Sequence, residues 1–362
     1  MISYSQWGNE LYSGKRSYGF IKNRKIFFSI GAIFVAISLI LIAIVGINPS
    51  IEFRGGSEFT VTHAKKVDQQ LAYDVLKEVN VNDAATRVSQ VGSDGIRVQT
   101  GKLNDKQTTD VHSKLAKAYG VQEKDVTSTY IGPSWGQDVT SKALWSLGIF
   151  LVLVSILMAL YFRTWTMAVA ALFALMHDVF LTAGFFALTQ VEVSPATVIG
   201  FLTILGYSLY DTVVVFDKIR ENTHEFLAQR KFTYGELVNL SVNQTLVRSI
   251  NTSVVAILPV AAIFVIGSFL LGAGTLLDIS LALLVGMIVG TLSSIFLASP
   301  LLLWLRERES KVKEHNKQVI NSRKKVNEDG EEIITEVTVS PLQAGKHLGH
   351  ASQPKKKAKS KR

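Results

Sequence analysis

Apolar residues along this 362-residue chain fall into six long runs, each near the length of about 20 residues that crosses a bilayer as a helix. The first run follows Lys22, Arg24 and Lys25, as a signal peptide would. Its apolar core is too long for one, however, and no small-x-small cleavage site follows it. The pattern therefore predicts a membrane α-helical protein with six spans, at about Ile26–Ile47, Ala143–Phe162, Trp165–Leu188, Ala196–Phe216, Ile250–Leu271 and Leu276–Leu305.

About 95 residues between the first two runs carry a different pattern, with short alternating segments separated by helical ones. Strand-like alternation occurs at 58–62, 87–91, 95–99 and 125–131, and Gly92-Ser93-Asp94 marks a hairpin turn. Helical spacing of apolar residues occurs near 71–79 and from about residue 105. This β-α-β-β-α-β order predicts one α+β ferredoxin-like domain. No His, Cys and carboxylate cluster in it indicates a metal or catalytic site, so we expect a binding or gating domain.

The positions of Lys and Arg predict the orientation, because cytoplasmic ends of spans carry an excess of both. They gather before the first run, after the fourth and after the sixth, whereas the loops around Glu192 and 272–275 carry none. Both termini are therefore expected in the cytoplasm and the ferredoxin-like domain outside. The expected units are a basic N-terminus (1–25), the first transmembrane helix (26–47), the exported domain (48–142), a five-helix bundle (143–305) and a disordered basic tail (306–362).

Much of the formal net charge of +9 comes from this tail, which ends in a run of Lys and Arg at 355–362. A solvated terminus that meets anionic membrane lipid is the favoured interpretation. Contact with RNA or an acidic partner is the alternative, but no aromatic residue interleaves the tail to stack on bases, so we expect no specific nucleic acid. The chain has no cysteine, which excludes disulfides and thiol chemistry.

Asp211 is the most informative polar residue within the apolar runs. A carboxylate at a helix centre costs about 2.5–3.5 kcal/mol on insertion scales, so it is functional by default. Helical steps back from Asp211 reach a mostly polar or small face, formed by Ser208, Tyr207, Ile204, Thr203 and Gly200. The opposite face suits lipid: Leu202, Leu205, Leu209, Val213 and Phe216. We therefore expect Asp211 to face the interior of the bundle.

Two further charged positions accompany it. Asp178, after His177 in the third run, suits a structural and a functional role equally. Arg248 lies near the cytoplasmic entry of the fifth run, where snorkelling toward the cytosol is the alternative to a functional role. A guanidinium that approaches a buried carboxylate favours its charged form, and burial favours the neutral form. Asp211 and Arg248 are therefore the candidate proton-coupling residues, with supporting polar residues Asp178, Thr203, Tyr207, Ser208, Gln244, Thr245, Asn251 and Thr252.

Protons are the expected coupling ion, with no metal or organic cofactor. No Ser/Lys, Ser/His or metal-ligand pairing occurs in the apolar runs, so we do not expect an enzyme with a covalent catalytic site.

Glycine motifs frame the predicted domain and mark the last run. Phe53-Arg54-Gly55-Gly56-Ser57 precedes the domain, and Gly132-Pro133-Ser134-Trp135-Gly136 follows it. Tight turns are the favoured interpretation, and hinges at Arg54, Gly55, Gly56, Gly132 and Pro133 are the alternative. Gly286-x-x-x-Gly290 gives the sixth run a flat face for close helix contact.

Several strings in this order resemble the SecF family of the SecDF accessory translocases, within the resistance-nodulation-division superfamily, over about residues 20 to 308. They are Phe53-Arg54-Gly55-Gly56, Gly132-Pro133, His177-Asp178, the segment from Gly206-Tyr207-Ser208 through Asp211 to Asn222, the segment from Asn243-Gln244-Thr245 through Arg248 to Ser253, and Gly286 to Thr291. Glu52 departs from the pattern, since family members usually carry Asp before Phe-Arg-Gly-Gly.

The resemblance implies a six-span bundle that pairs with a SecD-like subunit and associates with the SecYEG channel. SecA and a YidC-like insertase are further implied partners. Such a protein uses the proton-motive force to assist movement of unfolded exported polypeptide across or into the bacterial plasma membrane. The coupling carboxylate of the family falls on Asp211 and its fifth-span arginine on Arg248.

Two other functions stay open at this point. A proton-coupled exporter of small molecules or lipids in the same superfamily usually carries two duplicated halves, and no internal repeat is visible here. A non-transporting scaffold of the translocon would leave the intramembrane charges buried and inert. Export that does not respond to collapse of the proton gradient would favour the scaffold.

Overall fold

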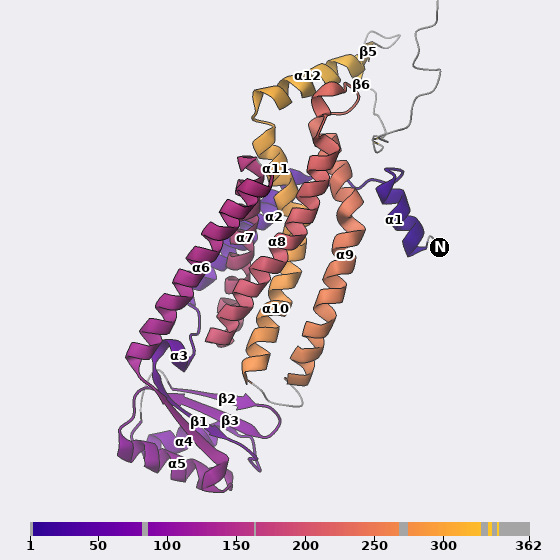
Figure 1. Ribbon diagram of the computed structural model, residues 1–362. Coiled ribbons are helices and arrows are strands. Elements are labelled where there is room, and N and C mark those ends of the chain that lie inside the picture. The colour runs from indigo at the N-terminus through magenta and orange to yellow at the C-terminus, as the bar shows by residue number, and fades with distance from the viewer. Residues whose placement is uncertain are drawn as a thin grey trace, which may run out of the picture.

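Long apolar helices run side by side as a bundle with a sheet domain at one end (Figure 1). The computed structural model describes residues 3–81, 86–162, 164–267, 274–326, 332–334 and 339. In this part of the chain six helices are long and apolar enough to cross a membrane, which confirms the predicted membrane α-helical fold class. They are α2 (Arg24–Ile44), α6 (Pro133–Phe162), α7 (Trp165–Thr189), α8 (Pro195–Thr223), α9 (Tyr234–Ile266), and α10 (Gly274–Ser293), which continues through a π-helical turn (Ser294–Ala298) into α11 (Ser299–Arg306).

Two of these helices begin well before their apolar runs. α6 begins at Pro133 rather than near Ala143, and α9 at Tyr234 rather than near Ile250. Apolar runs mark only the part of a helix that suits hydrocarbon, whereas the helix itself continues to its capping signal. For α9 that signal is a capping box, in which the Thr233 side chain accepts from the Glu236 backbone N–H and the Glu236 carboxylate accepts from that of Thr233. Residues 268–271, expected at the end of this span, lie outside the described residues.

The sheet domain contains the strands and helices that the alternation predicts. Its elements are β1 (Gly56–Val61), α4 (Gln69–Glu78), β2 (Arg87–Val91), β3 (Gly95–Thr100), α5 (Asp105–Tyr119), a 3-10 turn (Glu123–Asp125) and β4 (Val126–Ile131). The strands form an antiparallel sheet in the order β2-β3-β1-β4, which confirms the ferredoxin-like prediction. Buried apolar side chains join α4 and α5 to one face, including Phe59, Leu76, Ile96, Val98, Val111 and Leu115. The opposite face of the sheet looks toward the bundle (Figure 1).

Two short connections join this domain to the bundle, and their glycines differ in what the backbone requires. The first runs through α3 (Ile51–Arg54) into Gly55 and Gly56, with φ of 77° and 141°. A side chain at Gly56 would also collide with the carbonyl oxygen of Thr100. The second leads from β4 into α6, where Gly132 does not have a positive φ and Pro133 begins the helix, a position that tolerates proline. Turn geometry therefore accounts for the first motif, and a hinge motion stays a prediction.

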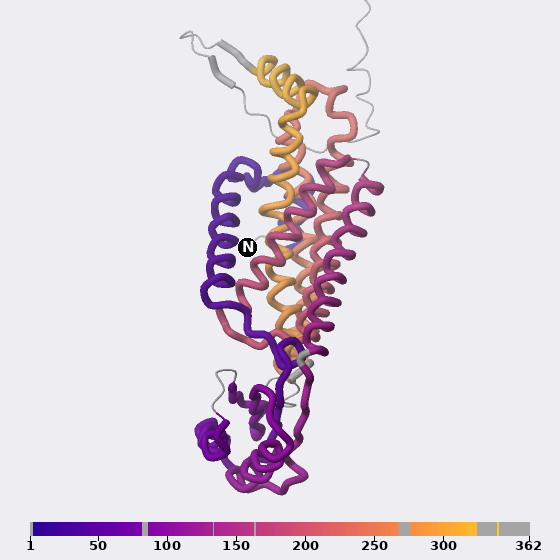
Figure 2. The backbone as a smooth tube through the Cα atoms, turned by 90° about the vertical axis from the view of Figure 1, so that its left-hand side faces the viewer, coloured from indigo at the N-terminus to yellow at the C-terminus, as the bar shows by residue number. Residues whose placement is uncertain are grey.

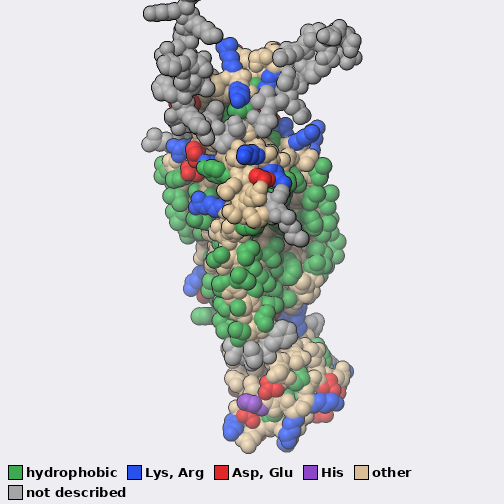
Figure 3. Space-filling model, turned by 90° about the vertical axis from the view of Figure 1, so that its right-hand side faces the viewer, with side chains coloured by type: hydrophobic (Ala, Val, Ile, Leu, Met, Phe, Trp, Pro, Cys, Tyr) green, Lys and Arg blue, Asp and Glu red, His purple; other side chains and the backbone are tan. Residues whose placement is uncertain are grey.

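The bundle is closely packed where small residues face a neighbouring helix. A β-carbon at Gly290 of α10 would lie 2.9 Å from the Ser208 β-carbon of α8, and one at Gly286 would collide with Ile204. Close contact of α8 and α10 is what the glycine spacing predicts. Figure 2 shows α2 along one side of the bundle, and Figure 3 shows a broad band of apolar side chains between the two charged ends of the molecule.

Short elements close the end of the bundle opposite the sheet domain. α1 (Tyr4–Tyr12) packs beside α9, and a 3-10 turn (Phe226–Ala228) lies between α8 and α9. α12 (Ser310–Arg323) is followed by the short strands β5 (Lys324–Val326) and β6 (Glu332–Ile334). The prediction of a disordered tail from residue 306 is therefore wrong for residues 310–323. Three buried side chains at helical spacing, Val312, His315 and Val319, give α12 a buried face that the surrounding charges hide in the sequence. The rest of the tail, including 355–362, lies outside the described residues.

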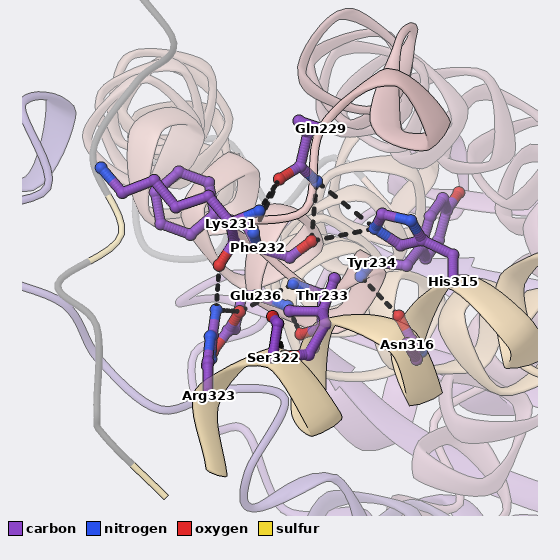
Figure 4. A network of polar contacts seen from close by, with 11 residues as sticks. Gln229, Lys231, Phe232, Thr233, Tyr234, Glu236, His315, Asn316, Ser322 and Arg323 are labelled. Carbon is purple, nitrogen blue, oxygen red and sulfur yellow. Dashed lines mark hydrogen bonds and ion pairs between the residues drawn. The ribbon is translucent and has the colours of Figure 1, made fainter. Parts of the chain in front are cut away.

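α12 is fastened to the loop that joins α8 to α9 (Figure 4). Asn316 accepts a hydrogen bond from the backbone N–H of Tyr234 at 2.9 Å. The two terminal nitrogens of Arg323 each donate to one carboxylate oxygen of Glu236, both at 2.7 Å. These hydrogen bonds raise the pKa of Arg323, so its guanidinium stays protonated at physiological pH. The start of α9 is thereby held in place from the C-terminal side.

Candidate functional site

Asp211 lies inside the bundle, where two hydroxyl groups from other elements hold its carboxylate. Asp211 is only 4% exposed. Ser249 of α9 donates to Oδ1 at 2.7 Å, and Ser294 of the π-helical turn donates to Oδ2. A π-helical turn widens the helix by one residue and often occurs at functional sites. Here it turns Ser294 toward α8, so three elements meet at Asp211.

Among the described residues, hydroxyl groups rather than a cation bind the Asp211 carboxylate. Within the described residues no ion pair joins Asp211 to Lys, Arg or His. An ionised carboxylate in a buried site is costly unless a positive charge or several donors compensate it. Asp211 is therefore a buried acid whose described partners are hydroxyl groups.

A second buried carboxylate binds Ser208, which lies one helical turn before Asp211 on α8. Asp178 of α7 is 1% exposed, and its Oδ2 accepts from Ser208 of α8 at 2.6 Å. Nδ1 of His177 lies 3.2 Å from its Oδ1. A cavity of about 10 Å³ beside Asp178 and Thr182 is close to the lower limit for one water molecule. Asp178, Ser208 and Asp211 therefore form a polar line through the apolar interior.

Arg248 does not contact Asp211 in this structure. Its side chain is exposed on α9, where Nη2 lies 3.5 Å from the hydroxyl oxygen of Tyr210. The next residue, Ser249, takes the position facing Asp211. The structure thus brings the two predicted proton-coupling residues onto neighbouring helices without pairing them.

The polar residues around Arg248 serve other contacts. Gln244 and Asn251 bind α1, through the carbonyl of Tyr12 at 3.0 Å and the hydroxyl of Tyr4 at 2.6 Å. Thr245 and Thr252 donate to carbonyls one turn earlier in their own helix, at 3.0 and 2.8 Å. Much of this polar run therefore fixes the N-terminal helix to α9, which sequence reading missed.

The predicted lipid face of α8 is wrong in part. Leu205 and Phe216 are buried against α6 and α7, with exposures of 1% and 0%. Thr203 is instead exposed, together with the other residues of a surface stripe, Ile199, Gly206 and Tyr210. Apolar periodicity could not decide the faces, because helices in a membrane bury apolar and polar faces alike. Tyr207 is half-buried, and its hydroxyl has no hydrogen-bond partner among the described residues.

Ser249 and Ser294, which bind the Asp211 carboxylate, are residues of the candidate site that the sequence did not indicate. The π-helical turn that directs Ser294 toward Asp211 has no readable signal in the sequence. The hydrogen bond joins residues 83 positions apart. No local pattern predicts such a pairing.

Comparison with known protein families gives two matches. Residues 111–308 match the family described as protein export membrane protein SecD/SecF, C-terminal, and residues 40–62 match the SecD/SecF GG motif. The second match includes Arg54, Gly55 and Gly56.

Similarity to individual proteins supports the two family matches. The chain is 43% identical over 316 residues to the protein translocase subunit SecF of Streptomyces coelicolor, covering 87% of this chain and 84% of that protein. It is 38% identical over 330 residues to SecF of Mycobacterium leprae, covering 87% of this chain and 70% of that protein. The crystal structure of SecDF from Thermus thermophilus, titled a translocon-associated membrane protein, superimposes with a TM-score of 0.73 at 31% identity. The match covers 82% of this chain but 39% of the SecDF chain.

Proposed function

This chain belongs to the SecD/SecF family of protein export membrane proteins, and we propose that it couples protein translocation to proton movement through Asp211. It is a multi-pass membrane protein with a SecF role in protein translocation. The proposal concerns how this role is driven. One observation supports it above the others: Asp211 is buried in the bundle and bonded to hydroxyl groups rather than to a cation.

The bonding of Asp211 fits a two-state cycle. In the arrangement described, Ser249 and Ser294 can hold the neutral carboxyl, donating to it and leaving room for its proton. The charged form needs a cation, and Arg248 is adjacent in sequence to Ser249. Successive residues of an α-helix differ by about 100° in direction, so a rotation of α9 by roughly that angle would replace Ser249 with Arg248. Such an exchange would release the proton.

Polar groups beside Asp211 support a route toward the sheet domain. Ser208 and Asp178 lie on the side of Asp211 that leads to the outer end of α8. Moving one proton charge through the membrane field supplies about 2.3 kcal/mol per 100 mV. That free energy is enough to change the ratio of two conformations by more than tenfold. Protons are the only coupling ion proposed, and the proposal includes no covalent catalytic step.

The surface stripe on α8 supports a SecD-like partner. A β-carbon at Gly206 would meet no atom within 4 Å, and Thr203, Tyr210 and Arg248 are exposed beside it. Polar and small residues on the outside of a bundle favour contact with another helix over contact with lipid. The Thermus thermophilus relative is named SecDF, and this chain matches 35% of it. We propose that a SecD-like bundle covers this stripe and completes the environment of Arg248.

The charge distribution supports the orientation. Lys and Arg flank the end of the bundle that carries α1 and α12, so we propose that both termini are cytoplasmic in the bacterial plasma membrane. The sheet domain then lies on the proton-rich side, where unfolded polypeptide emerges. SecYEG, SecA and a YidC-like insertase are the proposed further partners.

The test compares Asp211→Asn with Asp217→Asn in membrane vesicles that contain the chain, a SecD-like subunit and the SecYEG channel. Asp217 is an exposed carboxylate on the same helix, so the same chemical change is made outside the bundle interior. We expect Asp211→Asn to abolish the part of translocation that depends on a proton gradient and Asp217→Asn to preserve it. Full gradient-dependent translocation with Asp211→Asn would refute the proposal. Translocation that ignores the gradient in the unmodified protein would favour a scaffold instead.

A further inference from the structure

Four side chains join the sheet domain to the bundle at its outer end. Nε2 of Gln99, in β3, donates to Glu58 Oε2 at 3.0 Å and to Glu192 Oε1 at 2.7 Å. Arg97, also in β3, lies 3.7 Å from Glu58 and 3.6 Å from Glu192. Glu192 belongs to the loop between α7 and α8, whereas Glu58 belongs to β1. We call these four residues the latch, because they bind the open face of the sheet to the bundle.

Two carboxylates in the latch share the same hydrogen-bond and ion-pair partners. Glu58 and Glu192 share the Gln99 amide and the Arg97 guanidinium, and Nε of Arg97 makes no hydrogen bond among the described residues. Two carboxylates that share a site repel one another, so one of them is easier to protonate. Burial raises the pKa of Glu192, and the nearby Glu58 and Asp278 carboxylates add to the increase. The Gln99 hydrogen bond and Arg97 act in the opposite direction.

We propose that Glu192 is a second proton-binding site, on the outer side of the bundle, and that its protonation holds the sheet domain against the bundle. The site binds a proton rather than a metal or small molecule. It acts by positioning the sheet domain, independently of the proposed exchange at Asp211.

The direction of the pH effect follows from linkage between protonation and docking. Glu192 in the docked state has a raised pKa, whereas a hydrated Glu192 in an undocked state returns to the ordinary carboxyl value. The docked state therefore binds the proton more tightly, and acid favours docking. Docking is fully stabilised below the ordinary pKa and weakens as the pH rises through the raised one. A simple ion pair with Arg97 would have the opposite dependence.

The remaining charged groups around the latch have other partners or positions. Nη2 of Arg54, in α3, donates to the Gln99 side chain at 3.1 Å, so a second guanidinium lies beside the latch. Arg87, exposed on β2, is the cross-strand partner of Gln99 and lines the same pocket as Glu192. Asp278 lies at the outer end of α10. Arg97 forms the ion pair with Glu192 described above.

Water can reach the latch from the outer side. A pocket of about 790 Å³ is lined by Arg97, Gln99, Glu192 and Asp278, together with all of β2. This volume is far above that of a single water molecule, so protons can exchange with solvent.

A backbone contact beside the latch provides a pivot. The N–H of Val193 donates to the carbonyl of Asn48 at 2.8 Å, and that of Ser50 donates to the carbonyl of Val193 at 2.9 Å. These bonds contain no titratable group. They can persist while the side chains of the latch separate, so the sheet domain would swing about residues 48–50.

The test measures the distance between the sheet domain and the bundle as a function of pH in the full-length chain in lipid nanodiscs. The chain has no cysteine, so spin labels can be attached at Lys106→Cys in α5 and Thr189→Cys at the end of α7, both exposed. We expect a short distance in acid that lengthens as the pH rises above the ordinary carboxyl range, because the pKa of the docked Glu192 is raised. A distance that does not change as the pH rises would overturn the proposal.

Variants separate Glu192 from its neighbours. Glu192→Gln resembles the protonated form and should stay docked at every pH. Glu58→Gln removes a charge that raises the pKa of Glu192, so the transition should move to lower pH. Glu123→Gln, an exposed carboxyl in the 3-10 turn, is the matched control and should leave the transition unchanged. A transition in Glu192→Gln at the original midpoint would overturn the proposal.

Asp211→Asn distinguishes this proposal from the proposed function. The docking transition should persist in that variant, because Asp211 is not part of the latch. Failure of one proposal therefore leaves a measurable outcome for the other.

Discussion

Gly290→Ala tests the contact between α8 and α10 with the smallest change the chain allows. The added β-carbon would lie 2.9 Å from Cβ of Ser208 and 3.0 Å from its Oγ. The same hydroxyl donates to Asp178 at 2.6 Å. The new methyl group must therefore either push the helices apart or turn the Ser208 hydroxyl away from Asp178.

Both responses have a cost of similar size. Inserting one methyl group into a packed interior costs about 1–3 kcal/mol. Losing a hydrogen bond costs about 0.5–1.5 kcal/mol, or about 1.5–3 kcal/mol where the acceptor is charged. We expect Gly290→Ala to reduce the free energy of unfolding by about 1–3 kcal/mol, since only the cheaper response occurs. Ser208→Gly removes the colliding atoms and leaves Cα at 3.5 Å, an ordinary contact. The double variant should therefore lose less than the sum of the two single variants, with a coupling of about 1 kcal/mol or more.

The measurement is unfolding in mixed detergent and SDS micelles, followed by the fluorescence of the chain's five tryptophans. Gly206→Ala is the control, because its added β-carbon would meet nothing within 4 Å. Its stability should rise by about 0.5–1 kcal/mol, the gain in helix propensity that alanine brings at either position. Equal stability of Gly290→Ala and Gly206→Ala would refute the reasoning, and so would strict additivity with Ser208→Gly.

Two further predictions concern the ends of the bundle. Gly56→Ala should destabilise the sheet domain by more than about 1 kcal/mol, because φ is 141° and the β-carbon would meet a backbone oxygen. Gly132→Ala has no positive φ and should change thermal unfolding little; equal effects would contradict the turn assignment. Arg323→Gln breaks the ion pair with Glu236 and should speed amide exchange in α12 by severalfold, for a loss of roughly 1 kcal/mol. Lys317→Gln, at an exposed position on the same helix, should leave amide exchange unchanged. Amide exchange in α12 that stays slow in Arg323→Gln would show that the ion pair with Glu236 does not hold this helix.

Fold class was predictable from the sequence because the strongest signals are long and local. A run such as Trp165–Leu188 is apolar enough to be recognised alone, and the observed α7 ends one residue later, at Thr189. The hairpin around Gly92 likewise follows from a turn between two alternating segments. The ends of α6 and α9 were harder to predict, because they depend on capping outside the apolar window.

Only part of the candidate site could be predicted from the sequence. A carboxylate in an apolar run identifies Asp211 at once, since burying it is expensive wherever it lies. Its partners depend on how three elements meet, and a π-helical turn places Ser294 there. Nothing in the local sequence distinguishes Ser249 from Arg248 as the residue that faces Asp211. The latch was hidden for the same reason, because Glu192 lies in a short loop and its partners lie in another domain.

The two proposed proton sites are too far apart to influence each other strongly by charge alone. Glu192 precedes α8, and Asp211 lies 16 residues after its first residue, Pro195, which corresponds to roughly 24 Å along the helix. At an effective dielectric constant of about 20, two charges at that distance interact by about 0.7 kcal/mol, less than a tenfold change in an equilibrium. Any stronger coupling must therefore be mechanical. α8 suits that role, because a capping box at Ser194 and Thr197 fixes its outer end beside the latch. Closing the latch would then act on Asp211 by moving α8 relative to Ser249 and Ser294, which bind Asp211 from other elements.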